Sequence, residues 1–407
     1  MFFKNDPQYT QFGYFDVNGS KTFSKYEAWQ LSQQQNASVD DVKFIFNNDK
    51  MSQFDWSTEP SASLDELYAQ RARQLREKYD YLVLFYSGGI DSHVILNAFY
   101  KNNIKIDEII TIGNRAYLDD KAKINQEVFN KAIPYLDLLN LKKIGTKQTY
   151  IDIGQLIIDQ FNNPFHFENF LYYHNGPLSP WYTAYRSPMF KLQNQSHVDI
   201  SNSGRKIGYM FGYDKPNMFA IDGNWCFKYT DSVSDFGVRP YAFKEMLGGA
   251  LVNYHDEPFF VTPELPEMTI KQCHVITKMM NSITSWQDVR LCPVEDIANT
   301  GPFIEHPVGS SRISGRWVKK KELERVIYPS EDPDSFGNDK VGGSVMFTAR
   351  DKWFFQSKFE SRNNLIKKYK VLLREQPGYF KYADDDFPIN SISFYSKPYI
   401  IDKIKER

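Results

Sequence analysis

Residues Tyr81 to Asn103 read "YLVLFYSGGIDSHVILNAFYKNN", in which an apolar run changes abruptly into a short polar turn. The six residues YLVLFY form a continuous apolar segment, which is typical of a central parallel strand covered on both faces. From Ile90 onward the spacing of the apolar residues is helical. Gly88 and Gly89 therefore stand where a buried strand is expected to pass into a helix.

Strand and helix signals alternate on both sides of this turn. Ser63 and Glu66 have the spacing of a capping box, which predicts the start of an amphipathic helix before the strand. After the turn, residues 106–114 have the pattern of a second strand, 124–136 of a helix and 148–153 of a third strand. This alternation predicts an α/β fold with a doubly wound, mostly parallel sheet.

The chain has 407 residues, more than a single core usually supports, so we expect several packed units. Residues 1–60 contain a hairpin signal, Asn18-Gly19, and are predicted to form a small N-terminal α+β unit. Residues 61–235 contain the parallel sheet, and residues 236–407 carry mainly helical patterns. The basic residues from Arg71 to Lys78 are expected on a solvated helix face.

The composition is that of a folded protein, with 42% hydrophobic and 24% charged residues and a formal net charge of −1. This balance gives no general electrostatic reason for binding nucleic acid or a membrane surface. No run of about 18 apolar residues suggests a membrane span. The three cysteines, Cys226, Cys273 and Cys292, are far apart, which favours reduced thiols and a cytoplasmic location.

The turn contains the residue types that bind an anion. Gly88 and Gly89 permit positive φ and a close approach of the backbone, so successive N–H groups can face one ligand. The helix that begins at Ile90 adds unpaired amides and the positive end of its dipole. The hydroxyls of Ser87 and Ser92 can donate hydrogen bonds to phosphate oxygens.

Asp91 would repel a phosphate in this turn unless a cation lay between them, which indicates Mg²⁺. The same carboxylate could equally cap the helix. The turn is not a Walker A loop, because it has no lysine, and it is not a G-x-G-x-x-G fingerprint.

Residues Ser87 to Ser92, "SGGIDS", resemble the S-G-G-x-D-S signature of the PP-loop family, the N-type ATP pyrophosphatases. Members of that family carry this signature between the first strand and the first helix of an adenine nucleotide alpha hydrolase-like sheet. The arrangement is similar to the synthetase half of asparagine synthetases, and it also looks like asparagine-synthetase-like PP-loop proteins of tailed phages. The resemblance covers residues 61–235 and is specific only from Ser87 to Ser92.

The resemblance implies ATP and Mg²⁺ as cofactors and an adenylating reaction. Members hold the pyrophosphate of ATP in this loop, attack the α-phosphorus with a substrate oxygen, and pass the activated carbon to a nitrogen or sulfur nucleophile. Electrostatic stabilisation of the departing pyrophosphate suffices, so no general base is required. The residues implied for nucleotide binding are Ser87, Gly88, Gly89, Ile90, Asp91 and Ser92, and Asp91 is also implied as catalytic and metal-binding.

Two further stretches match places that the family uses. Gly113 ends "ITIG", where members commonly hold adenine and ribose, although an ordinary strand-ending turn explains it equally well. In "MFGYDKP", Gly212 is predicted to contact the pyrophosphate, Asp214 to bind metal, and Lys215 to act in catalysis by offsetting phosphate charge. The family has glutamate after this acid, whereas this chain has lysine, and a plain turn is the alternative.

Other chemistries are disfavoured by spacing. Structural zinc needs short-spaced ligand pairs, which His255, Cys273, His274, Cys292 and His306 do not form. The paired cysteines of tRNA-thiolating members are missing. Asparagine synthetases begin their glutaminase domain with a cysteine after the initiator methionine, and here Met1 is followed by Phe2, so we expect that domain to be absent.

We therefore expect an AMP-forming ATP pyrophosphatase or ligase that activates a carboxylate or carbonyl oxygen for amidation. Its expected partners are a small-molecule or nucleobase substrate and a separate amine or ammonia donor, with no membrane. The alternatives are a nucleobase or tRNA modification enzyme of the same family and a non-catalytic nucleotide-binding protein. The expected location is the cytoplasm, which is the host cytoplasm for a phage-encoded protein.

Overall fold

A computed structural model shows how the chain folds. It describes residues 5–38, 41–113, 128–141, 145–152, 194–212, 215–238, 253–285, 306–308, 320–336, 380–384 and 387–406, together with Phe3, Leu156, Leu171, Tyr172 and Asn175. Asp214 and Cys292, both singled out in the sequence, lie outside the described residues.

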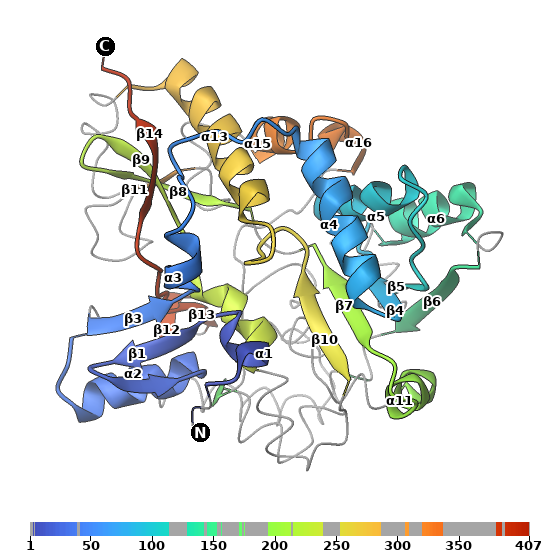
Figure 1. Ribbon diagram of the computed structural model, residues 1–407, viewed down its shortest axis with the longest axis horizontal. Helices are drawn as coiled ribbons and strands as arrows, with labels where there is room; N and C mark the ends of the chain where they lie inside the picture. The colour runs from blue at the N-terminus through green and yellow to red at the C-terminus, as the bar shows by residue number, and fades with distance from the viewer. Residues whose placement is uncertain are drawn as a thin grey trace.

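The described part contains a five-stranded, all-parallel sheet in the order β10-β7-β4-β5-β6. Helices flank this sheet on the right of Figure 1, which is compatible with a doubly wound fold and confirms the α/β class. The strands are β4 (Tyr81–Phe85), β5 (Glu108–Gly113), β6 (Lys147–Asp152), β7 (Ile207–Phe211) and β10 (Tyr254–Pro258). The flanking helices are α4 (Leu64–Lys78), α5 (Ile90–Tyr100), α6 (Ile133–Leu139) and α11 (Gln195–Asn202), and a π-helical turn, η3 (Val128–Ala132), precedes α6.

The strand order reverses direction at β4. The chain adds β5 and then β6 on one side of β4, and later places β7 and β10 on the other side. In the ladder, Phe85 lies opposite Ile110 of β5, and Leu84 lies opposite Met210 of β7. The carboxyl ends of β4 and β7 therefore meet at the switch point, which is the usual ligand site of an open α/β sheet.

Burial explains why these two strands are central. Residues 82–85 of β4 and all of β7 are buried, as the continuous apolar run predicted. Helix α5 is also buried on several sides, because Ile90, Val94, Leu96 and Phe99 are all inaccessible to solvent. The junction between β4 and α5 is thus fixed by packing on both of its ends.

The N-terminal unit is a three-stranded antiparallel sheet in the order β2-β1-β3. Asn18 and Gly19 have positive φ, at 49° and 90°, which confirms the predicted hairpin between β1 and β2. The elements are α1 (Pro7–Thr10), β1 (Tyr14–Val17), β2 (Ser20–Thr22), α2 (Lys25–Gln34), β3 (Val42–Ile45) and α3 (Asn48–Met51).

A second antiparallel sheet, in the order β11-β8-β9-β14, joins residues from distant parts of the chain. Its long neighbour α13 (Pro266–Ile283) lies between this sheet and α4 (Figure 1). The strands are β8 (Asn217–Ile221), β9 (Asn224–Lys228), β11 (His306–Val308) and β14 (Tyr399–Lys403). A short 3-10 turn, η5 (Asp231–Ser234), follows β9.

The described part of residues 236–407 contains both helices and strands. The prediction of a mainly helical region stays a prediction, because residues 239–252, 286–305, 309–319 and 337–379 lie outside the described residues. The described part contains the helices α13, α15 (Lys320–Ile327) and α16 (Pro333–Phe336), but also β10, β11, β14 and the pair β12 (Phe380–Asp384) and β13 (Phe387–Ser391). Strand β10 reads YHDEP and lacks apolar alternation, so its strand character depends on its pairing with β7.

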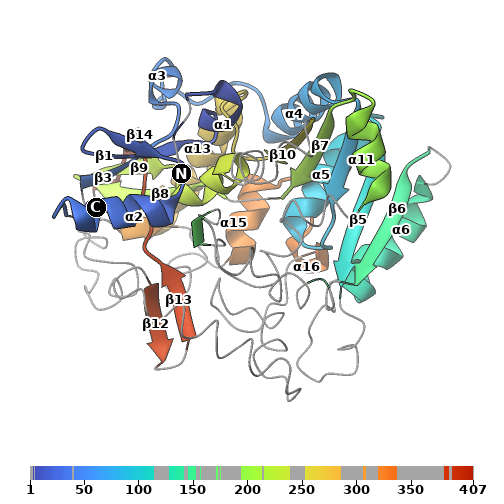
Figure 2. The ribbon, with the colours of Figure 1, turned by 90° about the horizontal axis from the view of Figure 1, so that it is seen from below.

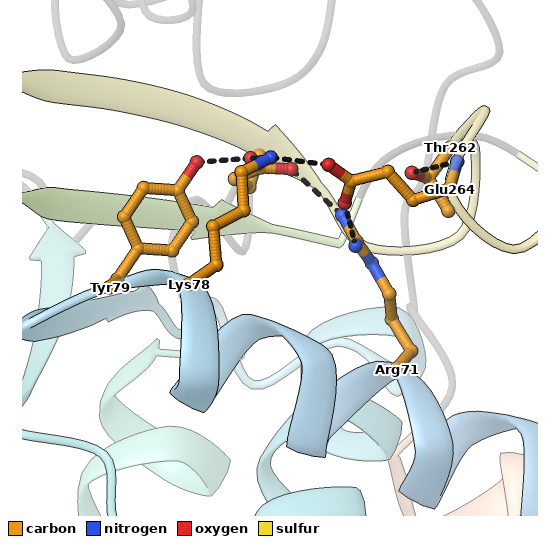
Figure 3. A network of polar contacts seen from close by, with 6 residues as sticks. Arg71, Lys78, Tyr79, Thr262 and Glu264 are labelled. Atoms are coloured by element: carbon orange, nitrogen blue, oxygen red, sulfur yellow. Dashed lines mark hydrogen bonds and ion pairs between the residues drawn. The ribbon is translucent and has the colours of Figure 1, made fainter.

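The structure also corrects the expected position of Arg71. Its side chain is 0% exposed and lies between two carboxylates, with Nη2 2.7 Å from Glu257 Oε2 and Nη1 2.6 Å from Glu264 Oε2. Lys78 binds the same two carboxylates at 2.7 and 2.6 Å (Figure 3). Tyr79 also donates a hydrogen bond to Glu257. The predicted solvated face of α4 is therefore partly an ion-pair cluster that fastens α4 to β10.

Among the described residues, no helix has the length and apolar character needed to cross a bilayer.

Candidate functional site

The turn from Ser87 to Ser92 is held together by its own serines. The Ser87 amide donates to Ser92 Oγ at 3.2 Å, and the Gly89 amide donates to Ser87 Oγ at 3.3 Å. Ser92 Oγ in turn donates to the Gly89 carbonyl at 3.0 Å. The two hydroxyls therefore fix the shape of the turn. The sequence predicted their contact with phosphate but did not predict this structural role.

Of the two glycines in the turn, only Gly88 uses the positive φ that glycine permits, and Gly89 is extended with φ of −80°. Gly88 has φ of 77°, where a side chain would be strained, and Gly89 is the N-cap of α5. Because Gly89 has no side chain, the first amides of α5 lack the usual hydroxyl or carboxylate cap. The positive end of an 11-residue helix is thus directed at the switch point.

Gly212 lies directly against the start of α5, and its predicted contact with pyrophosphate stays a prediction. A Cβ added to Gly212 would lie 2.8 Å from the Ser92 backbone nitrogen and 3.0 Å from the Asp91 carbonyl carbon. The first distance is shorter than real Cβ contacts and the second is tighter than most, and both neighbours are backbone atoms. The end of β7 and the turn after β4 therefore approach each other so closely that only glycine fits.

Asp91 is in contact with two side chains that come from other parts of the chain. Lys215 Nζ lies 2.7 Å from Asp91 Oδ1, and the Tyr328 hydroxyl donates to the same oxygen at 2.7 Å. Asp91 remains partly exposed, with 27% of its side chain accessible. The structure thus brings together two of the predicted catalytic residues, Asp91 and Lys215.

Lys215 is held between two carboxylates. Besides Asp91, its ammonium lies 3.3 Å from Glu324 Oε1, and its distance from the centre of the Tyr328 ring is 5.7 Å. Burial opposes the charged form, but the carboxylates of Asp91 and Glu324 outweigh it and raise the pKa of Lys215 above its ordinary value. Lys215 therefore remains a cation at physiological pH.

The predicted metal role of Asp91 has to be judged against this ammonium. Asp91 and Glu324 are oxygen donors of the kind that Mg²⁺ prefers, and they converge on one cation, which here is Lys215. A divalent ion at Asp91 Oδ1 would require Lys215 to withdraw. Within the described part of the chain, no three His, Cys, Asp or Glu side chains gather as a metal site. The metal role of Asp91 and Asp214 stays a prediction.

Gly113 ends β5 at the same edge of the sheet as the turn, three residues beyond the partner of Phe85. A Cβ on Gly113 would lie 2.9 Å from Phe129 Cζ and 3.1 Å from the Tyr150 hydroxyl. Two aromatic side chains thus cover this glycine. Its predicted contact with adenine or ribose stays a prediction.

Sequence reasoning missed Glu324 and Tyr328. Both belong to the segment Lys320–Phe336, which contains α15 and α16, and no local motif marks either residue. The signal that the sequence does contain is an apolar pair, Leu323 and Ile327, which predicts a helix packed on one side. It does not predict what that helix packs against.

Neither protein-family models nor curated protein sequences match this chain. The case for a function therefore depends on the site itself.

Proposed function

We propose that this chain binds ATP with its pyrophosphate at the Ser87–Ser92 turn and cleaves the nucleotide to AMP and pyrophosphate. The reaction would activate a carboxylate or carbonyl oxygen for attack by an amine. The observation that carries this proposal is the close packing of Gly212 on the Asp91–Ser92 backbone, with the uncapped start of α5 and Lys215 beside it. Helix-start amides and one cation at a switch point are the groups that bind phosphate in open α/β sheets.

The residues of the chain would act on the leaving group. The amides at the start of α5 and the ammonium of Lys215 would stabilise negative charge as it develops on the departing pyrophosphate. The rigid turn, fixed by Ser87 and Ser92, would keep these donors in place without reorganisation. Magnesium, when it is bound with the nucleotide, would supply additional positive charge at the phosphates, with Asp91 and Glu324 as its available oxygen donors.

Binding and product analysis together test the proposal. We expect the purified protein to bind ATP, measured by titration calorimetry, more tightly than AMP, because the turn contacts the phosphates. With ATP, Mg²⁺, ammonia and a panel of carboxylic acids, we expect AMP and pyrophosphate in equal amounts. Formation of ADP and phosphate would contradict the proposal, and so would the absence of any ATP binding.

A non-catalytic nucleotide-binding protein is the second candidate. The observation in its favour is the pairing of Lys215 with Asp91, which leaves Asp91 Oδ1 in contact with an ammonium. Tight binding of ATP with no AMP released in the presence of any acceptor would support it. A tRNA-modifying role receives less support, because Arg71 is buried in an ion-pair cluster and adds nothing to a basic face.

A further inference from the structure

The segment Lys320–Phe336 lies next to α5 and the candidate site, although it comes far later in the chain. Figures 1 and 2 show α16 beside α5. Tyr328, which reaches Asp91, is 237 positions away from it in the sequence. Glu324 belongs to α15 and contacts Lys215, and Tyr328, which directly follows α15, contacts Asp91.

The position of this segment is fixed by contacts outside the candidate site. The Tyr68 hydroxyl of α4 donates to the Ile327 carbonyl at 2.5 Å. Glu331 accepts hydrogen bonds from Asn97 and Lys101, each at 2.8 Å, on one face of α5. Because these anchors are independent of Asp91 and Lys215, the segment can hold Tyr328 and Glu324 in place.

Glu324 is expected to weaken the attraction of Lys215 for a phosphate. Asp91 and Glu324 carry two negative charges and Lys215 carries one positive charge. Glu324 is only 1% exposed, so water screens it poorly, and its attraction for Lys215 competes with any phosphate that approaches the ammonium. Tyr328 is expected to favour phosphate binding, because its hydroxyl holds the Asp91 carboxylate in one orientation and offsets part of its negative charge.

We propose that the segment Lys320–Phe336 forms part of the nucleotide site, with Tyr328 and Glu324 as positioning residues for Asp91 and Lys215. This inference rests on the proposed binding of ATP at the Ser87–Ser92 turn. It adds that nucleotide binding is controlled by a segment outside the parallel sheet, which restrains the cation of the site.

Hydrogen exchange of the wild-type chain tests the inference without any substitution. On addition of ATP, we expect slower exchange in peptides that contain Ser87–Ser92 and also in peptides from Lys320–Phe336. Protection of the turn without any change in the segment would overturn this inference and leave the proposed function standing. No protection of the turn would count against the proposed function itself.

Two isosteric variants and a control test the positioning roles by the dissociation constant of ATP in EDTA. Tyr328→Phe should weaken binding about tenfold, because Asp91 loses the hydroxyl that offsets its negative charge and then holds Lys215 more tightly and repels the phosphates more strongly. Glu324→Gln should tighten binding about threefold to tenfold, because Lys215 is released from one of its two carboxylates. Ser330→Ala removes a hydroxyl of the same segment that bonds Asp65 on α4, and it should leave the constant unchanged.

The opposite signs separate positioning from simple disruption. A purely structural role would weaken ATP binding in both variants or in neither, and either result would overturn the inference. Thermal melts identify a variant that does not fold. In that case the hydrogen exchange of the wild-type chain decides whether the segment Lys320–Phe336 responds to ATP.

Discussion

Among single residues, the candidate site depends on the glycines that let backbone segments approach each other and on the ammonium of Lys215. Gly88 supplies a left-handed backbone conformation, and Gly212 supplies the absence of a side chain against Ser92. Lys215 supplies positive charge next to Asp91. The left-handed conformation of Gly88 was predictable from the sequence, because glycine adopts positive φ without strain where a strand turns into a helix.

Gly212→Ala should separate β7 from the start of α5, because the added methyl would meet backbone atoms at 2.8 and 3.0 Å. We expect ATP affinity, measured by calorimetry, to fall by more than about tenfold, and stability to fall by about 1–3 kcal/mol. Gly208→Ala is the matched control in the same strand, since its methyl would meet the ring of Tyr79 instead. Equal ATP affinity of the two folded variants would contradict the role of Gly212.

Lys215→Met keeps the length of the side chain and removes its charge. We expect ATP binding in EDTA to weaken at least about tenfold, because charge-assisted contacts of a cation with phosphate are lost. Lys50→Met changes an exposed lysine of the N-terminal unit and should have no effect. Unchanged affinity of Lys215→Met would show that the ammonium does not contact the nucleotide.

At the scale of the element, the cluster between α4 and β10 shows how charge replaces apolar packing. Arg71 and Lys78 of α4 form four ion pairs, two with Glu257 of β10 and two with Glu264 in the segment after it, and all the distances are 2.6 or 2.7 Å (Figure 3). Strand β10 is an edge strand with little apolar character, so this cluster is what attaches it to the helix layer. The main contribution of such a buried ion pair to stability is that each buried charge has a partner of opposite charge.

Arg71→Met should destabilise the protein by about 3–5 kcal/mol, because Glu257 remains buried with only Lys78 to balance it. Urea denaturation measures the change. Arg73→Met is the control, since Arg73 is exposed on the same helix, and it should change stability by less than about 0.5 kcal/mol. Recovery of part of the loss by adding Glu257→Gln would support the charge argument, whereas equal stability of the two single variants would contradict it.

At the scale of the whole molecule, a buried polar chain joins strands and a helix at the amino edge of the parallel sheet. Glu108 of β5 accepts from His197 of α11 at 2.8 Å and from Thr149 of β6 at 2.5 Å. The other nitrogen of His197 lies 2.8 Å from the hydroxyl of Tyr209 in β7. This chain lies at the opposite edge from the turn, so we assign it to stability.

Acid stability should depend on Glu108. Burial alone would raise its pKa, but hydrogen bonds from His197 and Thr149 and the charge of His197 lower the pKa to about 2. Because the folded pKa lies below the ordinary value of 4.5, this stabilisation is complete above about pH 5 and is lost as the pH falls towards 2. Its size is about 2–3 kcal/mol.

Glu108→Gln should therefore reduce the difference in urea midpoint between pH 7 and pH 3, to which Glu264 and Glu331 also contribute because their pKa values are lowered too. The exposed Glu77 of α4 provides a control, Glu77→Gln, which should keep the wild-type difference. A wild-type pH dependence in Glu108→Gln would show that other carboxylates determine acid stability.

The strand, turn and helix around Gly88 and the hairpin at Asn18-Gly19 could be predicted from the sequence, because each depends on residues that are neighbours in the chain, and the alternation of strand and helix patterns indicated the α/β class. The contacts of Tyr328 with Asp91 and of Glu324 with Lys215, and the burial of Arg71 against Glu257 of β10, depend on the tertiary structure. These contacts join residues more than a hundred positions apart. No local pattern of propensity or hydrophobic spacing specifies them, because they follow from the path of the whole chain and the charge balance of its interior.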